Sequence, residues 1–425
     1  MVILAFALVL SACASAPRSD PADLDAVARD YVRLQLEIGT HEDGYIDAYF
    51  GDPAIKAAAE AAPRALPALA EEADRLLSLL AVATVSEPML ERRRDFLRAH
   101  LVAARFRIDM IGGARAPFAT EAQALFGVTP ELKPLSAYDP VLARIEALVP
   151  GDGPLADRVQ AFRDRYAIPS DRLEAVMQAA IAECRRRTLQ HIALPAEEAF
   201  TLEFVANQSW SGYNWYQGSA HSLIQINTDF PVFIDRALDL GCHEGYPGHH
   251  THNTLLEYSL VRGRGWVENT VFPLFSPISF IAEGEGNAGI DLTFPAAERL
   301  EFEARVLFPL AGLDPASAPA YAELRAAMKD LQGARMTIGR MWLDGEIASR
   351  DAALDLIQRY QLVSRARADQ SLRFTEHYRS YIINYGIGEE WVAAHLAAAG
   401  DDPAARWDAM ARLLSEPTLP SDLRR

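Results

Sequence analysis

The stretch "CHEGYPGHHTHN", residues 242 to 253, holds four of the ten histidines in the chain, together with a glutamate and a Pro-Gly pair. His243 and Glu244 match the start of the HExxH zinc motif, in which two histidines one turn apart bind the metal and the glutamate acts as general base. Position 247 is a proline, however, and a proline inside a regular helix costs about 3 kcal/mol. We therefore expect the helix to break or bulge at Pro247.

The second histidine ligand depends on how the chain leaves this helix. On an unbroken helix His250 would share a face with His243, but it would lie about 10 Å further along, too far for two Zn–N bonds of about 2.0 Å. A two-residue bulge at Pro247 and Gly248 would instead bring His249 into the place of the second ligand. We favour His249, with His250 as the alternative. A solvated or capping run of histidines without a metal is the structural alternative for the whole cluster.

A third ligand is expected from the segment "SFIAEGEGNAG", residues 279 to 289. Glu283 lies in the middle of its helical pattern and is the best candidate, with Glu285 as the competitor. Three glycines interrupt this pattern, each at a cost of about 1 kcal/mol relative to alanine. Close packing against the metal-bearing helix would explain them. The same glycines satisfy GxGxxG, but a phosphate would meet both glutamates, so we reject a dinucleotide site. The glycines are Gly284, Gly286 and Gly289.

The hydrophobic pattern of the remaining chain is mainly helical. Between Asp23 and Gly112 the apolar positions recur at helical spacing, as at Leu97, Leu101, Ala104 and Ile108. The segment "HSLIQINTDF", residues 221 to 230, alternates with the period of a strand, and Ser276 with Pro277 is typical of a helix start. We predict one mainly α-helical domain over residues 23 to 425, with a small β-sheet beside the metal-binding helix.

The first residues indicate export. "MVILAFALVLSACASAP" is apolar and ends in small residues, and it is too short for a membrane span of roughly twenty residues. Leu10 to Cys13 resemble the bacterial lipobox, which predicts a lipoprotein signal peptide over residues 1 to 12, a lipidated Cys13 and a tether over residues 13 to 22. Ala14 after the cysteine resembles lipoproteins sorted to the outer membrane. An ordinary signal peptide cleaved near Ala14 or Ala16 is the alternative.

Composition limits the classes of possible binding partner, and it leaves the redox state of two cysteines to be explained. The net charge of -17 argues against a nucleic-acid partner, which would require a basic face. We expect a periplasmic protein that meets the membrane only through its lipid anchor. With Cys13 lipidated, Cys184 and Cys242 remain. Cys184 falls on the apolar face of a helical pattern, which favours a buried core thiol, while a disulfide between the two stays open.

"HEGYPGHH" followed about forty residues later by an "EG" helix resembles the bacterial family catalogued as domain of unknown function 885, which carries HExxPGHH and an EGWALYAE-like segment. That family is related to the glutamate-zincin metallopeptidases, such as thimet oligopeptidase and the Taq-type carboxypeptidases. The resemblance extends over most of the chain and implies a large helical zincin-like domain with a deep cleft. Its other matches are "FATEAQALFGV" (118 to 128), "ARMTIGRMWLDGEIASRDAA" (334 to 353) and "SYIINYGIG" (380 to 388).

The resemblance also implies roles for individual residues. Glu244 would be the general base, Tyr385 would help to stabilise the tetrahedral intermediate, and Arg335 would bind a substrate carboxylate. The ion would be Zn²⁺, although a ligand set of two histidines and a glutamate also suits Mn²⁺ or Co²⁺. The implied metal ligands are His243, His249 and Glu283.

The chain departs from the family pattern after the "EG" pair. Glu285, Gly286 and Asn287 stand where the family usually has Trp, Ala and Leu, which indicates a divergent member. Our hypothesis is a metal-dependent peptidase or amide hydrolase that acts on short peptides in the bacterial cell envelope. The alternative is a non-catalytic, metal-containing envelope lipoprotein that binds a ligand or a partner.

Overall fold

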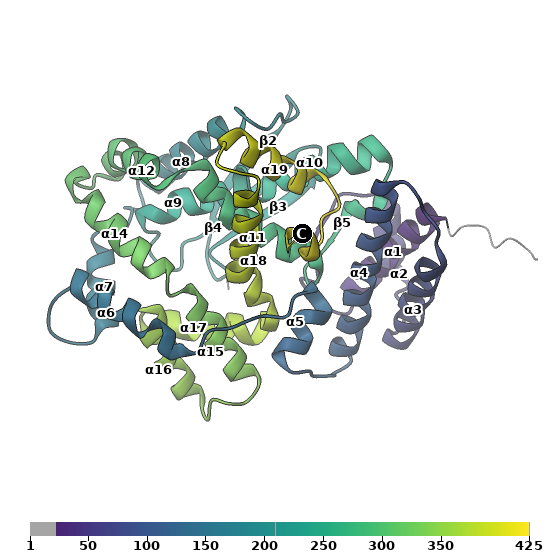
Figure 1. The fold of residues 1–425 in the computed structure, drawn as a ribbon, viewed down its shortest axis with the longest axis horizontal. Coiled ribbons are helices and arrows are strands. Elements are labelled where there is room, and N and C mark those ends of the chain that lie inside the picture. Colours follow the sequence, from purple (N-terminus) through teal and green to yellow (C-terminus); the bar gives the residue numbers. More distant parts are fainter. Residues whose placement is uncertain (1–22, 209, 425) are drawn as a thin grey trace, which may run out of the picture.

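The computed structural model describes residues 23–208 and 210–424, and the fold is mainly α-helical, as the sequence predicts (Figure 1). The predicted signal peptide, Cys13 and the tether lie outside the described residues. Helices α1 to α4 gather at one end of the molecule and α12 to α17 occupy the other, with α11 and α18 between them (Figure 1). The first helices are α1 (Leu24–Gly39), α2 (Pro53–Ala61), α3 (Leu66–Val82), α4 (Pro88–Ile111) and α5 (Phe118–Phe126).

The N-terminal helices form because their apolar positions share one face. Leu97, Leu101, Ala104 and Ile108 of α4 are all buried, as the spacing predicts. They join a core cluster that continues into α11 and α18. The helices that follow are α6 (Asp139–Leu148), α7 (Leu155–Asp164), α8 (Leu173–Thr188), α9 (Ile234–Leu240), α10 (His249–Leu256) and α11 (Pro277–Thr293).

The predicted strand is the centre of a three-stranded sheet. In β4 (His221–Asn227), Ile224 and Ile226 are completely buried and alternate with less buried neighbours. Strand β2 (Ala199–Val205) pairs with β4 in parallel, and β3 (Gly212–Gly218) pairs with it antiparallel. A second sheet, which the sequence did not predict, joins β1 (Ile46–Tyr49) to β5 (Val271–Pro273).

Helix α11 is held in the middle of the molecule by a close contact with α18. A Cβ added at Gly284 would lie only 2.6 Å from the carbonyl oxygen of Gly388, so both positions depend on glycine. Ser276 and Pro277 begin α11 as predicted. The C-terminal helices are α12 (Ala296–Phe302), α13 (Phe308–Ala311), α14 (Ala318–Lys329), α15 (Gln332–Leu343), α16 (Arg350–Gln361), α17 (Arg365–Tyr378), α18 (Ile383–Ala398) and α19 (Pro403–Ser415).

The two cysteines inside the described residues form a disulfide. Cys184 of α8 is bonded to Cys242, with their Cα atoms 5.5 Å apart, so the pairing left open by the sequence is present and Cys184 is not a free thiol.

Across residues 23–208 and 210–424, none of the helices has the length and apolar character needed to cross a membrane. The single-domain organisation stays a prediction.

Candidate metal centre

The helix that carries His243 breaks at the predicted place. After α9 the chain continues as one wide π-helical turn, Gly241–Gly245, and leaves helical geometry at Tyr246. A new helix, α10, starts at His249. Proline at position 247 lacks an amide hydrogen for a continuous helix, and the amide of Gly248 bonds instead to the carbonyl of Cys242 at 3.0 Å.

This break brings two histidines toward one carboxylate. The ring centroids of His243 and His249 are 4.6 Å apart, and Nε2 of His243 lies 3.2 Å from Oε2 of Glu283 on α11. One ligand atom from each of the three residues lies within 4.8 Å of the others. The structure therefore assembles the predicted set, and its role as a metal site stays a prediction.

The two alternative ligands, His250 and Glu285, contact other residues instead. His250 is completely buried; its Nδ1 lies 2.8 Å from the hydroxyl of Ser222 and its Nε2 lies 3.1 Å from Glu198. Oε1 of Glu285 lies 3.3 Å from Nδ1 of His252. Neither His250 nor Glu285 is part of the three-residue group.

Burial and neighbouring charge set the protonation of the group. Burial, together with the charge of His243, lowers the pKa of His249 to about 4, so His249 is neutral and able to act as a ligand. Burial also disfavours the charged form of His243, but contact with Glu283 and the charge of Glu244 outweigh it and raise its pKa to about 9. Without a metal, His243 and Glu283 thus form an ion pair.

Sequence reasoning missed two residues that orient the group. Asn287, one turn after Glu283 on α11, places Oδ1 3.0 Å from Nδ1 of His243. The hydroxyl of Tyr381 donates a hydrogen bond of 2.6 Å to Oε1 of Glu283. Asn287 had been noted only as a departure from the family. The signal available in the sequence was a polar residue at i+4 from a predicted ligand.

Glycine allows α11 to approach the segment of His243 and Pro247 closely, as predicted. A Cβ at Gly286 would lie 2.8 Å from Nδ1 of His243, and one at Gly289 would lie 2.9 Å from Pro247. The third glycine, Gly284, faces α18 instead. Two of the three glycines therefore explain why an unfavourable helix sequence occurs here.

Glu244 is buried beside the group and belongs to no ion pair in the described part of the chain. Burial is the main reason that its pKa rises to about 7, and the charge of Glu283 adds to the effect. Strand β3 covers it: Asn214 donates a hydrogen bond of 2.6 Å to the Glu244 carbonyl, and a Cβ at Gly212 would lie 2.8 Å from Oε1 of Glu244. A carboxyl group in this position is suited to proton transfer.

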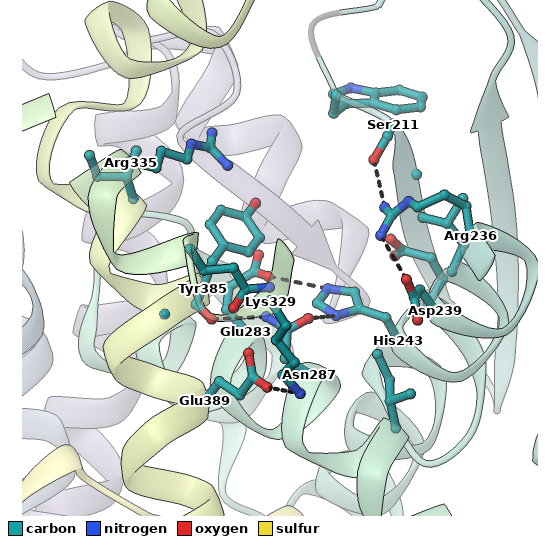
Figure 2. A pocket seen from close by; sticks show the side chains of 18 of the residues that line it. Ser211, Arg236, Asp239, His243, Glu283, Asn287, Lys329, Arg335, Tyr385 and Glu389 are labelled. Atoms are coloured by element: carbon teal, nitrogen blue, oxygen red, sulfur yellow. Dashed lines mark hydrogen bonds and ion pairs between the residues drawn. The ribbon is translucent and has the colours of Figure 1, made fainter. Parts of the chain in front are cut away.

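The group opens into a cavity of about 920 Å³ whose walls include Tyr385 and Arg335. Figure 2 shows both of these side chains on the wall opposite Arg236, with His243 between them. The guanidinium carbon of Arg335 lies 5.8 Å from the Tyr385 ring centroid, and its Nε is buried without a hydrogen-bond partner. Between residues 23 and 424, residue 209 aside, no carboxylate forms an ion pair with Arg335, so a salt bridge does not account for its charge.

The donor set fits a divalent transition metal. Two imidazoles and one carboxylate are the ligands of many catalytic zinc sites. Oε2 of Glu283 is buried and accepts no hydrogen bond within the described part of the chain, although Nε2 of His243 lies 3.2 Å away. A cation between the two atoms would satisfy this oxygen. Gly286 leaves room for the His243 ring at this point.

Comparison with known proteins adds information on the fold. No family model matches the chain, and no curated protein matches it. The chain is similar to the crystal structure of a protein from Colwellia psychrerythraea described as a candidate lipoprotein, with a TM-score of 0.52 and 13% identity over 84% of this chain and 68% of that one. The likeness shows the fold. A candidate lipoprotein of unknown function from Shewanella oneidensis has a TM-score of 0.45 at 12% identity, over 85% of this chain and 76% of that one.

Proposed function

We propose that the chain is a zinc-dependent peptidase or amide hydrolase. One observation carries the proposal: His243, His249 and Glu283 offer ligand atoms within 4.8 Å of one another, with Glu244 buried next to them in the wall of a cavity. A purely structural zinc site is normally closed by four protein ligands and needs no additional carboxyl group beside it. Three ligands with an adjacent carboxyl group favour catalysis.

The residues of the cavity have separate tasks in this reaction. A bound Zn²⁺ would supply Lewis acidity toward the scissile carbonyl and the attacking water. Glu244 accepts the proton of that water as its oxygen bonds to the carbonyl carbon, and it returns the proton to the amine as the C–N bond breaks. In the proposed reaction Tyr385 donates a hydrogen bond to the developing oxyanion, and Arg335 binds a carboxylate of the substrate.

The proposed location is the periplasm, with a lipid anchor at Cys13 in the outer membrane. The disulfide between Cys184 and Cys242 supports export, because structural disulfides persist in oxidising compartments. The description of the Colwellia psychrerythraea protein as a candidate lipoprotein agrees with the lipobox of this chain. Short envelope peptides or related amides are the proposed substrates.

The test combines metal content with cleavage. The full chain, purified in detergent and loaded with Zn²⁺, Mn²⁺ or Co²⁺, is incubated with a mixed peptide library, and the products are identified by mass spectrometry. We expect about one metal ion per chain and cleavage that Glu244→Gln abolishes while it retains the metal. A chain that binds metal but cleaves no peptide would overturn the proposal and favour a non-catalytic envelope lipoprotein. A chain that binds no metal would remove the metal centre itself.

A further inference from the structure

Three arginines from three helices line one part of the cavity. One of them, Arg236, lies on the side opposite Tyr385 and Arg335 (Figure 2). Arg163 lies on α7, Arg236 on α9 and Arg367 on α17. All three line the main cavity and also a side pocket of about 90 Å³. We call them the arginine cluster.

Two members of the cluster share one aromatic ring. The guanidinium carbon of Arg163 lies 4.2 Å from the ring centroid of Phe233, and that of Arg367 lies 5.5 Å from the same centroid. Arg367 also lies 4.5 Å from the ring of Phe230. The aromatic rings hold the charges in place without neutralising them.

The cluster has few close carboxylate partners. Arg163 reaches Asp235 only at 4.0 Å. Arg236 is 3.4 Å from Asp239, but Asp239 lies closer to another cation, Arg299, at 2.8 Å. The guanidinium group of Arg367 donates to the carbonyl of Pro231 at 3.2 Å.

Arg367 lacks any carboxylate within ion-pair distance among the residues that the structure describes. Burial and the charges of Arg163 and Arg236 lower its pKa to about 10, against partial compensation from Asp164 and Asp235. Positive charge is thus left over at this end of the cavity, in a chain whose net charge is -17.

Neighbouring arginines in the same cavity wall show the contrast. Arg299 and Arg325 form ion pairs with Glu303, at 2.7 and 2.6 Å. Pairing is the ordinary state of a buried charge, because an uncompensated one is costly. The arginine cluster therefore has an arrangement that an anionic ligand would complete.

The position of Arg236 relates the cluster to the candidate metal centre. Arg236 precedes His243 by seven residues on the same helical segment, which corresponds to about 10 Å at roughly 1.5 Å per residue. An extended peptide covers about the same length in three residues. Figure 2 shows Arg236 facing the cavity on the side of His243 opposite Tyr385.

We propose that Arg163, Arg236 and Arg367 form an anion-binding subsite that takes a carboxylate-bearing side chain of the substrate, about three residues from the scissile bond. The inference rests on the proposed peptidase function and deepens it, since it names the substrate class as acidic peptides. Guanidinium groups suit this task because they bind carboxylates through paired, charge-assisted hydrogen bonds.

The test uses peptides that the full, metal-loaded chain cleaves. Pairs of peptides differ only by Glu or Gln at each position from two to four residues on either side of the cut. We expect kcat/KM to be about tenfold higher for the Glu peptide at one of these positions, because a charge-assisted hydrogen bond is lost with Gln. Equal rates for Glu and Gln at every position would overturn the proposal.

Variants assign the preference to the cluster. Arg367→Gln should reduce the Glu preference to about twofold or less by lowering kcat/KM mainly for the Glu peptide, and Arg367→Lys should retain part of the preference. Arg165→Gln is the matched control, because it removes the same charge beside α7 from a residue that does not line the cavity. A preference that survives in folded Arg367→Gln would contradict the assignment.

A binding experiment separates the subsite from the proposed function. Succinate and its neutral diamide are compared as stabilisers of the metal-free chain by thermal unfolding at low ionic strength. We expect succinate to raise the Tm of the wild type and of Arg165→Gln, but not of Arg367→Gln. If no peptide is cleaved while this pattern holds, the peptidase proposal fails and the anion site stands. If peptides are cleaved while succinate has no selective effect and no Glu preference is found, the anion site fails alone.

Discussion

Nδ1 of His243 lies 3.0 Å from Oδ1 of Asn287, and the other end of the same amide donates a 3.0 Å hydrogen bond to the carbonyl of Tyr385. A backbone carbonyl accepts only, so the amide orientation is fixed and its oxygen faces His243. Nδ1 of His243 must then carry the hydrogen, which leaves Nε2 directed toward Glu283. Asn287, a departure from the family that the chain resembles, thus fixes which nitrogen keeps its hydrogen when the His243 ring is neutral and able to bind a metal.

Replacing Asn287 by leucine, the residue usual in the family that the chain resembles, should weaken metal binding about 10- to 100-fold, the range found when a hydrogen bond to a ligand histidine is lost. Affinity is measured by competition with a coloured chelator. Asn287→Asp keeps an acceptor at Nδ1 and should bind metal more tightly than the leucine variant. Equal affinity in wild type and Asn287→Leu would remove Asn287 from the site.

Gly286 should be irreplaceable even by alanine. The added methyl carbon would lie 2.8 Å from Nδ1 of His243, so the ring must move although alanine favours the helix by about 1 kcal/mol. We expect Gly286→Ala to remain folded and to lose metal affinity. Gly245→Ala is the control, because its methyl carbon would meet Ile181 at an ordinary 3.8 Å. Equal loss in both variants would point to a general effect of added bulk.

Tyr381 and Tyr385 lie one turn apart and should have separable effects. Tyr381 donates to Glu283 at 2.6 Å, whereas Tyr385 lines the cavity. Tyr381→Phe should therefore lower metal affinity by about tenfold, the smaller end of the range for groups that orient a ligand. Tyr385→Phe should lower kcat while metal affinity stays unchanged. The reverse pattern, measured by chelator competition and peptide cleavage, would exchange the two roles.

The sequence was informative where the deciding residues are close together in the chain. Pro247 predicted the helix break and the favoured position of His249, because a proline lacks the amide hydrogen that a helix needs. The glycines around Glu283 predicted close packing of α11, which Gly286 and Gly289 show.

Residues that meet only through the tertiary fold escaped prediction. Tyr381 is 98 positions from Glu283, and the family resemblance drew attention to Tyr385 instead. The sheet of β1 and β5 pairs Ala48 with Phe272. Its strands are too short to show the alternation of apolar and polar residues from which a strand is predicted. The arginine cluster likewise draws on three distant helices.

The disulfide should contribute strongly to stability, because it joins residues that are 58 positions apart. Closing a loop of this length in the unfolded chain corresponds to about 4 kcal/mol of unfolding free energy in the chain-entropy description. We expect dithiothreitol to lower the free energy of unfolding of the wild type by this order in urea titrations. The Cys184→Ser/Cys242→Ser variant should match the reduced protein and respond no further. An unchanged midpoint in reductant would show that the bond is absent in solution.

Acid should destabilise the protein in part through His100, a buried residue of α4. Burial lowers the pKa of His100 to about 4, while a histidine in the unfolded chain titrates near 6.5. Its Nε2 has no hydrogen-bond partner among the residues that the structure describes, and its ring centroid lies 3.9 Å from that of Phe96. Between these two pH values the unfolded state binds a proton that the folded state excludes, so stability is lost as the pH falls.

The free energy of unfolding falls by about 1.4 kcal/mol for each pH unit from about 6.5 down to about 4. Below that pH His100 contributes no further change. Urea titrations of wild type and His100→Gln over this range should show a shallower decline in the variant. His377→Gln, which removes an exposed histidine on α17, should follow the wild type. Parallel curves for all three proteins would mean that His100 is protonated without cost in the folded state, against the burial that surrounds it.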